Sequence, residues 1–200
     1  MAGPSTTSRP CTTIASRESV SGAATKAAPP PTESVVALYT REQTSPKQRL
    51  LSVKTENISQ ELKVRPQWVV WKAIGEKPDK VPYSAREGLK ASSTDLMTWS
   101  TFEEAHEALC TGHYSGVGFV FSSADPFTGI DLDGCVDEDG EVEDWALEIV
   151  SHFESYTELS ATGTGLHVIV KGEVPNRRKG GIEVYSSKRF FTVTGHVLEV

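Results

Sequence analysis

Cysteine is scarce in this sequence, and its three copies lie far apart at positions 11, 110 and 135. Such a set is too small and too scattered for a disulfide framework or for a zinc site built on cysteines. A chain without either feature is typical of a reducing compartment, so we expect a cytoplasmic protein.

Long apolar runs are also missing. No stretch approaches the roughly 20 apolar residues that a membrane-spanning helix needs, and the first 20 residues lack the apolar region of a secretory signal. The sequence therefore predicts no membrane partner.

Positive charge is in short supply over the whole chain, whose formal net charge is −7. This total argues at first against a nucleic-acid partner. The charge is unevenly placed, however, because residues 1–60 carry seven Lys or Arg and only four Asp or Glu. Within the acidic remainder, five basic residues fall in the window 177–189. These are Arg177, Arg178, Lys179, Lys188 and Arg189. This local basic strip is more informative than the total.

The composition divides the chain into two parts. Residues 1–34 consist largely of Ala, Ser, Thr and Pro, which bury too little apolar surface to offset the entropy of ordering them. We interpret 1–60 as a disordered tail with a short helix near Lys47–Val53, and 61–200 as a single folded domain. The chain stops at "HVLEV" without a turn or cap, which is consistent with a domain cut short.

Periodicity predicts two helices and six strands in the domain. The expected helices cover 100–112 and 142–153, and the expected strands are 68–71, 116–122, 127–133, 166–172, 180–186 and 189–196. Strands 116–122 and 127–133 are separated by a short turn-rich segment, so we expect them to pair with each other. The order of elements favours an α+β domain in which helices pack on a largely antiparallel sheet.

The first expected helix has a start signal and an apolar stripe. Ser100 is placed to cap it and Glu103 to complete a capping box. The stripe is Phe102, Ala105, Ala108 and Leu109. In the second helix, the expected inner face is Trp145, Ile149 and Phe153.

Two aspartates lie inside an otherwise apolar strand, in "TGIDLDGC". In a strand, residues two apart share a face, so Asp131 and Asp133 point away from Ile130 and Leu132. A solvated strand face explains this pattern without any function. If that face lines a site instead, two like charges at close range call for a cation between them.

A glycine turn precedes a histidine in "SATGTGLHVIV". Gly163 and Gly165 permit a tight turn whose backbone N–H groups can face an anion. His167, one residue inside the next strand, would then be placed to donate a hydrogen bond to a phosphate oxygen. The simpler interpretation is a hairpin turn followed by a histidine with ordinary partners.

A third acid, Glu183, lies between Ile182 and Val184 and therefore faces away from them. Basic residues of the strip surround it and could neutralise phosphates. A solvated edge strand protected by Lys and Arg explains the basic residues but not the glutamate.

Together, these features are the set that phosphoryl transfer needs. Carboxylates can hold two divalent ions that bridge the attacking and leaving oxygens. Magnesium prefers oxygen ligands and suits three carboxylates plus a triphosphate. Cationic side chains take up the remaining charge.

The segments "GIDLDGC", "SATGTGLHV" and "GGIEVYSSKRFFTVTGH" resemble, in order and spacing, the three motifs of the archaeo-eukaryotic primase superfamily. They are most similar to its primase–polymerase (PrimPol) branch from phages, plasmids and mobile elements. The segment "KVPYSAREGLKASSTDLMTWSTFEEA" resembles the N-terminal part of that branch. The resemblance covers roughly residues 64–198. It implies an RRM-like catalytic core that polymerises nucleotides on a DNA template with two Mg²⁺ or Mn²⁺ ions.

The resemblance also implies roles for single residues. Asp131 and Asp133 would be the metal-binding acids of the first motif, and Glu183 the third acid, where the family more often has aspartate. Further residues would contact the nucleotide, and these are His167, Ser160, Thr164, Lys179 and Arg189. The implied partners are a DNA template, nucleoside triphosphates and a helicase domain or protein, in the cytoplasm or nucleoid of a host cell.

Two other functions use the same residues. A metal-dependent nuclease or other phosphotransferase could employ the acids with water as the nucleophile. A catalytically inactive module could keep the sheet for binding single-stranded DNA, although such modules usually display aromatic side chains on it.

Overall fold

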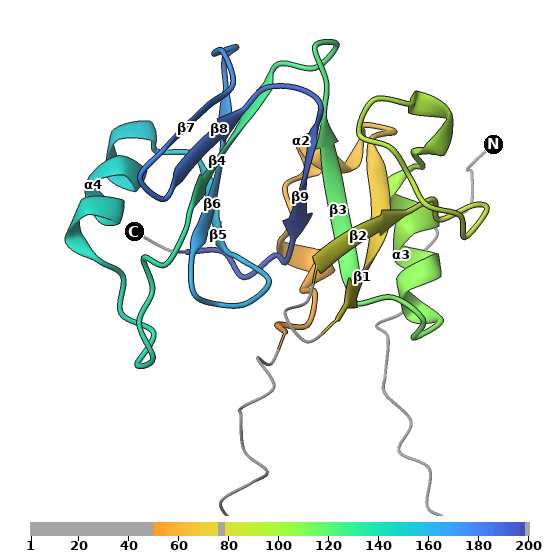
Figure 1. Ribbon diagram of the computed structural model, residues 1–200, viewed down its shortest axis with the longest axis horizontal. Helices are drawn as coiled ribbons and strands as arrows, with labels where there is room; N and C mark the ends of the chain where they lie inside the picture. Colours follow the sequence, from red (N-terminus) through yellow and green to blue (C-terminus); the bar gives the residue numbers. More distant parts are fainter. Residues whose placement is uncertain (1–49, 76–78, 199–200) are drawn as a thin grey trace, which may run out of the picture. The chain divides into compact units, whose positions relative to one another are not determined.

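The computed structural model describes residues 50–75 and 79–198, all within one compact unit, Gln48–Val200 (Figure 1). The disordered tail expected for the start of the chain falls mostly on residues 1–49, outside the described residues. The division into tail and catalytic domain therefore stays a prediction.

Nine strands in the described residues form two antiparallel sheets (Figure 1). The four-stranded sheet has the order β2-β1-β3-β9, with β1 at Trp68–Ile74, β2 at Asp79–Tyr83, β3 at Gly116–Phe121 and β9 at Arg189–Val193. The five-stranded sheet has the order β5-β6-β4-β8-β7, with β4 at Phe127–Leu132, β5 at Tyr156–Leu159, β6 at Leu166–Lys171, β7 at Arg177–Lys179 and β8 at Ile182–Tyr185.

The described helices are short. They are α2 (Gln60–Lys63), α3 (Phe102–Cys110) and α4 (Asp144–Phe153), with 3₁₀ turns η1 at Thr55–Asn57 and η2 at Leu96–Thr98. None of them is long and apolar enough to cross a membrane. The α+β class with antiparallel sheets is confirmed, whereas the narrower expectation of an RRM-like core stays a prediction.

The predicted pairing of strands 116–122 and 127–133 is wrong. β3 pairs with β1 and β9, whereas β4 pairs with β6 and β8. The chain crosses between the sheets at Asp125, whose carboxylate accepts hydrogen bonds from the backbone N–H groups of Ser122 and Phe127 and from Gln67. Both strands are almost wholly buried, so each finds partners distant in sequence on both edges.

Helix α3 begins one residue later than predicted. Thr101 is its N-cap, and Glu104 closes the capping box through the Thr101 backbone N–H. Ser100 is instead bridged to Trp68, because the two residues exchange backbone hydrogen bonds of 2.8 and 3.0 Å. The predicted stripe is confirmed, since Phe102 and Ala105 are buried and Ala108 and Leu109 pack on the same core.

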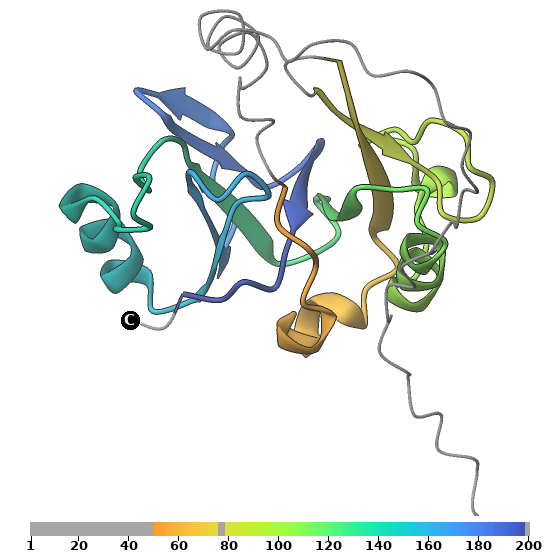
Figure 2. The ribbon, with the colours of Figure 1, turned by 90° about the horizontal axis from the view of Figure 1, so that it is seen from below.

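The two faces of the five-stranded sheet pack differently. Ile130, Leu132 and Val168 on one face pack with Ala146 and Val150 of α4. Helix α4 therefore covers the face that points away from β9 and β3 (Figures 1 and 2). The predicted inner face of α4 is wrong at its two aromatic positions, since Trp145 and Phe153 are 38% and 40% exposed. The small Ala146 and Val150 contact the sheet instead and allow the helix to approach it closely.

The other face of the five-stranded sheet meets the four-stranded sheet. The rings of Phe121 (β3) and Phe191 (β9) lie over Gly129 of β4, where an added Cβ would come within 2.5 Å of the Phe191 ring. Gly129 is therefore needed for this close approach of the sheets. Two residues further along β4 on the same face is Asp131.

Residues 50–60 pack with the domain, although the sequence assigned them to the tail. Ile58 is buried in the core shared by the sheets and α3. The backbone N–H of Lys54 donates to the carbonyl of Thr194, and that of Leu51 donates to the carbonyl of Ala161. The described part of the predicted helix near Lys47–Val53 is not helical.

Candidate active site

Five ionisable side chains lie side by side across the five-stranded sheet. In the antiparallel register, Asp131 is directly opposite His167 on one side and Glu183 on the other. Glu158 is opposite His167, and Arg178 is opposite Glu183. We call these residues, Glu158, His167, Asp131, Glu183 and Arg178, the charged row. It crosses β5, β6, β4, β8 and β7, and opposite residues of neighbouring strands share a face.

The charged row occupies the face turned toward the four-stranded sheet. Its neighbours along the strands, such as Leu132, Leu166 and Ile182, face α4 instead. The ring of Phe191, from the other sheet, packs on the His167 imidazole with the centroids 4.9 Å apart. The expectation that Asp131 and Glu183 point away from their apolar neighbours is consistent with this packing.

His167 lies between two carboxylates. Its Nε2 atom is 3.7 Å from Oδ1 of Asp131, and its Nδ1 atom is 3.6 Å from Oε1 of Glu158. Both separations exceed a hydrogen bond but allow an ion pair when the imidazole is protonated. The side chain is only 4% exposed, so the neighbouring groups, rather than water, surround its nitrogen atoms.

Asp131 is an acid of the site whose charged form is disfavoured by its surroundings. Burial of its carboxyl raises its pKa above the usual range, and the charges of Asp133 and Glu183 raise it further. His167 and Lys80 oppose this shift. A carboxylate with part of its hydration removed and two like charges nearby is a position that a cation would stabilise.

Asp133 follows the end of β4 and is exposed. Its backbone N–H donates to the carbonyl of Gly181 at 2.9 Å, which ties the end of β4 to the start of β8. Together with its effect on the pKa of Asp131, this contact places Asp133 at the same end of the site.

Glu183 is almost fully buried and engages three partners. Its carboxylate lies 2.6 Å from Nε of Arg178 and 3.7 Å from a guanidinium nitrogen of Arg189, and it accepts a hydrogen bond from the Tyr185 hydroxyl. The last contact raises the pKa of Tyr185. Arg189 belongs to the four-stranded sheet, so Glu183 links the two sheets.

Of the two predicted cations, the structure brings Arg189 to the acids but not Lys179. Lys179 is opposite Ile182, on the face away from Glu183. Arg178, the residue before Lys179, is the cation that contacts Glu183. The sequence could not distinguish Arg178 from Lys179, because the choice depends on the register of β7 with β8.

Ser160 and Thr164 lie in the turn between β5 and β6. The turn is closed by hydrogen bonds between Ser160 and Gly165 and from the Gly163 N–H to the Ser160 carbonyl. The hydroxyl groups of Ser160, Thr162 and Thr164 form a chain with separations of 3.2 and 2.9 Å. The carbonyl of Thr164 accepts a hydrogen bond from Val136, so the turn lies beside the segment that follows Asp133.

Sequence reasoning missed Lys80 on β2. Burial lowers the pKa of its ammonium group, whereas the negative charges of Asp131 and Asp133 oppose this shift and the positive charge of Arg189 adds to it. Lys80 is therefore close enough to interact with both aspartates, although it comes from the far edge of the other sheet. A lysine in a short extended segment gives no local signal of such a neighbour.

The donor chemistry of the aspartates fits a hard divalent ion. Among the residues described, no group of three or more His, Cys, Asp or Glu is close enough to form a metal site as it stands. Asp131 and Asp133 offer carboxylate oxygens, which Mg²⁺ and Mn²⁺ prefer. The oxygens of Glu183 already contact Arg178 and Tyr185, so an ion would compete with these partners.

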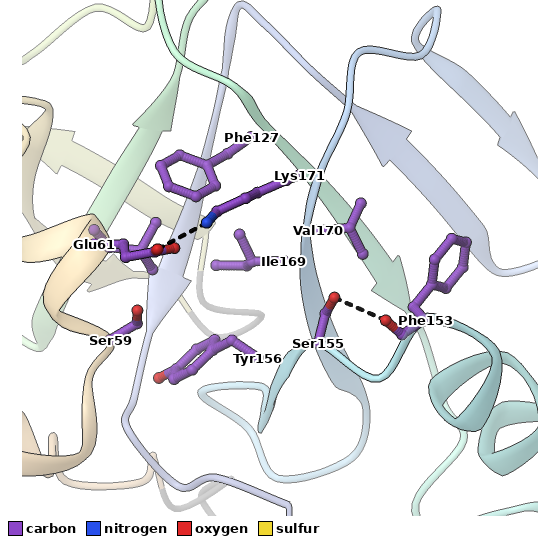
Figure 3. Close-up of a pocket in the computed structure, with 10 residues that line it drawn as sticks. Ser59, Glu61, Phe127, Phe153, Ser155, Tyr156, Ile169, Val170 and Lys171 are labelled. Atoms are coloured by element: carbon purple, nitrogen blue, oxygen red, sulfur yellow. Dashed lines mark hydrogen bonds and ion pairs between the residues drawn. The ribbon is translucent and has the colours of Figure 1, made fainter.

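Two cavities of the described domain lie away from the charged row. One of about 420 Å³ is bordered by Phe127, Tyr156 and the ion pair between Lys171 and Glu61, 2.7 Å long (Figure 3). Another, of about 480 Å³, lies over the outer face of the sheet near Val174. No member of the charged row borders either cavity.

The sequence is similar to a DNA primase-polymerase of Nitratiruptor phage NrS-1, with 42% identity over 142 residues. The match covers 66% of this chain and 20% of the phage protein, so the chain spans about a fifth of the length of that relative. No protein-family model matches the sequence.

Proposed function

This chain is a relative of the phage-type primase-polymerases, and from this relationship we propose that it is a nucleotidyltransferase that joins nucleotides on a DNA template. The observation that supports the proposal most is the register of β4 with β6 and β8. It aligns Asp131, His167 and Glu183, which come from three separate motifs, on one face of one sheet.

In the proposed reaction, Asp131 and Asp133 would hold two divalent ions, Mg²⁺ or Mn²⁺, with Glu183 as the third acid. Such ions, when bound, would supply the positive charge that orients a triphosphate and stabilises the charge developing on the transferred phosphate. The raised pKa of Asp131 supports this role, because an ion would offset the burial and the neighbouring like charges that now disfavour its charged form.

Cations and donors from both sheets would hold the triphosphate. Arg189 and Arg178 flank Glu183, and Lys80 interacts with both aspartates, so positive groups surround the acids. His167 would donate from Nε2 to a phosphate oxygen, because this atom faces Asp131 and the triphosphate would lie beside that acid. Ser160 and Thr164 would contribute hydroxyl or backbone donors from the turn beside the end of β4.

The biological setting follows from the same resemblance. We propose that the protein acts in replication of a phage, plasmid or mobile element, on a DNA template and with nucleoside triphosphates. A helicase domain or protein is the proposed further partner. A polymerase needs positive potential only along the path of its substrates, so the net charge of −7 is compatible with this function.

A single assay tests the function. The protein is incubated with a labelled primer–template, Mg²⁺ or Mn²⁺ and nucleotides, and the product length is measured. Lengthening of the primer is expected. Shortening would instead identify a nuclease. DNA binding that is insensitive to divalent ions, without any incorporation, would identify an inactive single-strand-binding module.

A further inference from the structure

Glu158 is a fully buried carboxylate at the end of the charged row. Its Oε2 atom accepts hydrogen bonds from the backbone N–H of Gly195 and from the Tyr156 hydroxyl, both at 2.7 Å. The backbone N–H of Thr194 is 3.0 Å from Oε1 and 3.1 Å from Oε2. Burial and the charge of Glu158 raise the pKa of Tyr156, so its hydroxyl remains a donor. The donors therefore fix the carboxylate firmly in place.

The two oxygens of Glu158 are unequally occupied. Oε2 receives three donors, whereas Oε1 receives only the Thr194 N–H and retains the capacity to accept another hydrogen bond. Oε1 is also the atom that lies 3.6 Å from Nδ1 of His167.

His167 supplies the matching donor. Its Nδ1 atom is buried and has no hydrogen-bond partner. A buried polar atom without a partner is costly, and the Glu158 carboxylate is the acceptor that it faces. A shift of less than 1 Å would bring the two atoms into hydrogen-bond distance.

We propose that Glu158 is a positioning residue, which holds the Nδ1–H of His167 and thereby directs Nε2 of the same ring toward the Asp131 side of the site. The contact of His167 with a nucleotide rests on the function proposed above, whereas the arrangement of the imidazole by Glu158 does not. Glu158 itself touches neither the nucleotide nor the acids and acts through the histidine.

Replacing Glu158 with glutamine makes a sharp test. The amide oxygen of Glu158→Gln is expected at the Oε2 position, because three donors converge there. The amide NH₂ then occupies the Oε1 position and points a donor at Nδ1. This arrangement favours the tautomer in which Nδ1 is the acceptor and Nε2 carries the hydrogen.

The state of His167 is read by ¹⁵N NMR of the histidine-labelled protein without any nucleotide. The protein has five histidines, and the signals missing from His167→Gln assign the one of interest. We expect a protonated Nδ1 in the wild type and an unprotonated Nδ1 in Glu158→Gln. Tyr156→Phe is the matched control, since it removes one donor to Oε2, keeps the carboxylate, and should leave the imidazole signals as in the wild type.

Nucleotide affinity provides the second measurement. Beside the Glu158 carboxylate the His167 ring can donate from Nδ1 and Nε2 at once, as an imidazolium that makes a charge-assisted hydrogen bond to phosphate, whereas in Glu158→Gln it can donate from Nε2 only as a neutral ring. We therefore expect Glu158→Gln to weaken binding of a non-hydrolysable nucleoside triphosphate with Mg²⁺ about fivefold. In a His167→Ala background the same change should have no effect, because Glu158 acts only through the histidine. An exposed glutamate outside the site, Glu173, gives the control Glu173→Gln, which should bind as the wild type does.

An unprotonated Nδ1 in the wild type overturns the proposal, and this result requires no variant to fold. An unchanged Nδ1 in folded Glu158→Gln overturns it too, as does an equal loss of affinity in the His167→Ala background. If no variant or wild-type protein binds nucleotide, the proposed function fails, and the NMR result alone decides the role of Glu158.

Discussion

Asp131 and Glu183 lie directly opposite each other in the antiparallel pair of β4 and β8. Like charges in such a position destabilise a sheet. Arg178 and Arg189 contact Glu183 and offset part of this repulsion, whereas Asp131 keeps a raised pKa. The site therefore has one acid that is neutralised by arginines and one that a cation would stabilise.

Replacing either aspartate should abolish nucleotide incorporation. We expect Asp131→Ala and Asp133→Ala to lower kcat more than about a hundredfold, because each removes a ligand for an ion that stabilises the transition state. Primer extension measures the rate, and circular dichroism checks the fold. Asp139→Ala is the matched control, since Asp139 is an exposed acid after the site. Normal activity with unchanged metal dependence in either variant would contradict the proposed mechanism.

Replacing His167 should weaken substrate binding more than it slows the chemical step. His167→Ala removes a donor to a phosphate of the incoming nucleotide, so we expect KM for the nucleotide to rise about tenfold with a smaller change in kcat. Steady-state primer extension separates the two constants. A fall in kcat at constant KM would assign the imidazole to the chemical step instead.

Two adjacent arginines test the register of β7. Arg178 is opposite Glu183, whereas Arg177 is opposite Val184 and lies on the other face. We expect Arg178→Ala to raise KM for the nucleotide severalfold, since it removes a cation from the acids. Arg177→Ala, which removes the same charge from the other face, should have a much smaller effect. Equal effects would show that the strip acts only through its total charge.

The raised pKa of Asp131 predicts a pH-dependent cost to stability. As pH rises, the unfolded chain loses this proton first, so ionisation lowers the free energy of unfolding until the pH passes the folded pKa. Above that value the cost is constant, and below about pH 4 it is absent. Asp131→Asn should therefore be more stable than the wild type at about pH 7, and the difference should disappear in acid.

Urea denaturation at several pH values measures this difference. Added Mg²⁺ should raise the melting temperature of the wild type more than that of Asp131→Asn, because bound ions stabilise only the state that holds them. Asp139→Asn provides the control. If the wild type is more stable than Asp131→Asn at neutral pH without metal, the charged form of Asp131 does not destabilise the folded protein, and the prediction is wrong.

Part of this site could be predicted from short stretches of sequence. Alternation along a strand placed Asp131 and Glu183 on the faces opposite their apolar neighbours, and the spacing of the glycines predicted the turn before His167. The apolar stripe of α3 followed from helical periodicity. These features depend on residues a few positions apart, for which the backbone geometry of a helix or strand is sufficient.

The pairing of strands required the tertiary structure. β3 and β4 are adjacent in sequence but lie in different sheets, and only the register of β7 with β8 selects Arg178 over Lys179. Lys80, Arg189 and Phe191 reach the site from the four-stranded sheet. Their positions depend on contacts between residues far apart in the chain, which no local pattern records.

The sequence by itself therefore determined which side chains can share a face, because that depends only on the two-residue repeat of a strand. Only the tertiary structure decided which of these faces meet, because strand order and sheet packing minimise the free energy of the whole domain. Glu158 illustrates the difference. It is one of many acids in the sequence, and it becomes the partner of His167 only through the fold that buries it.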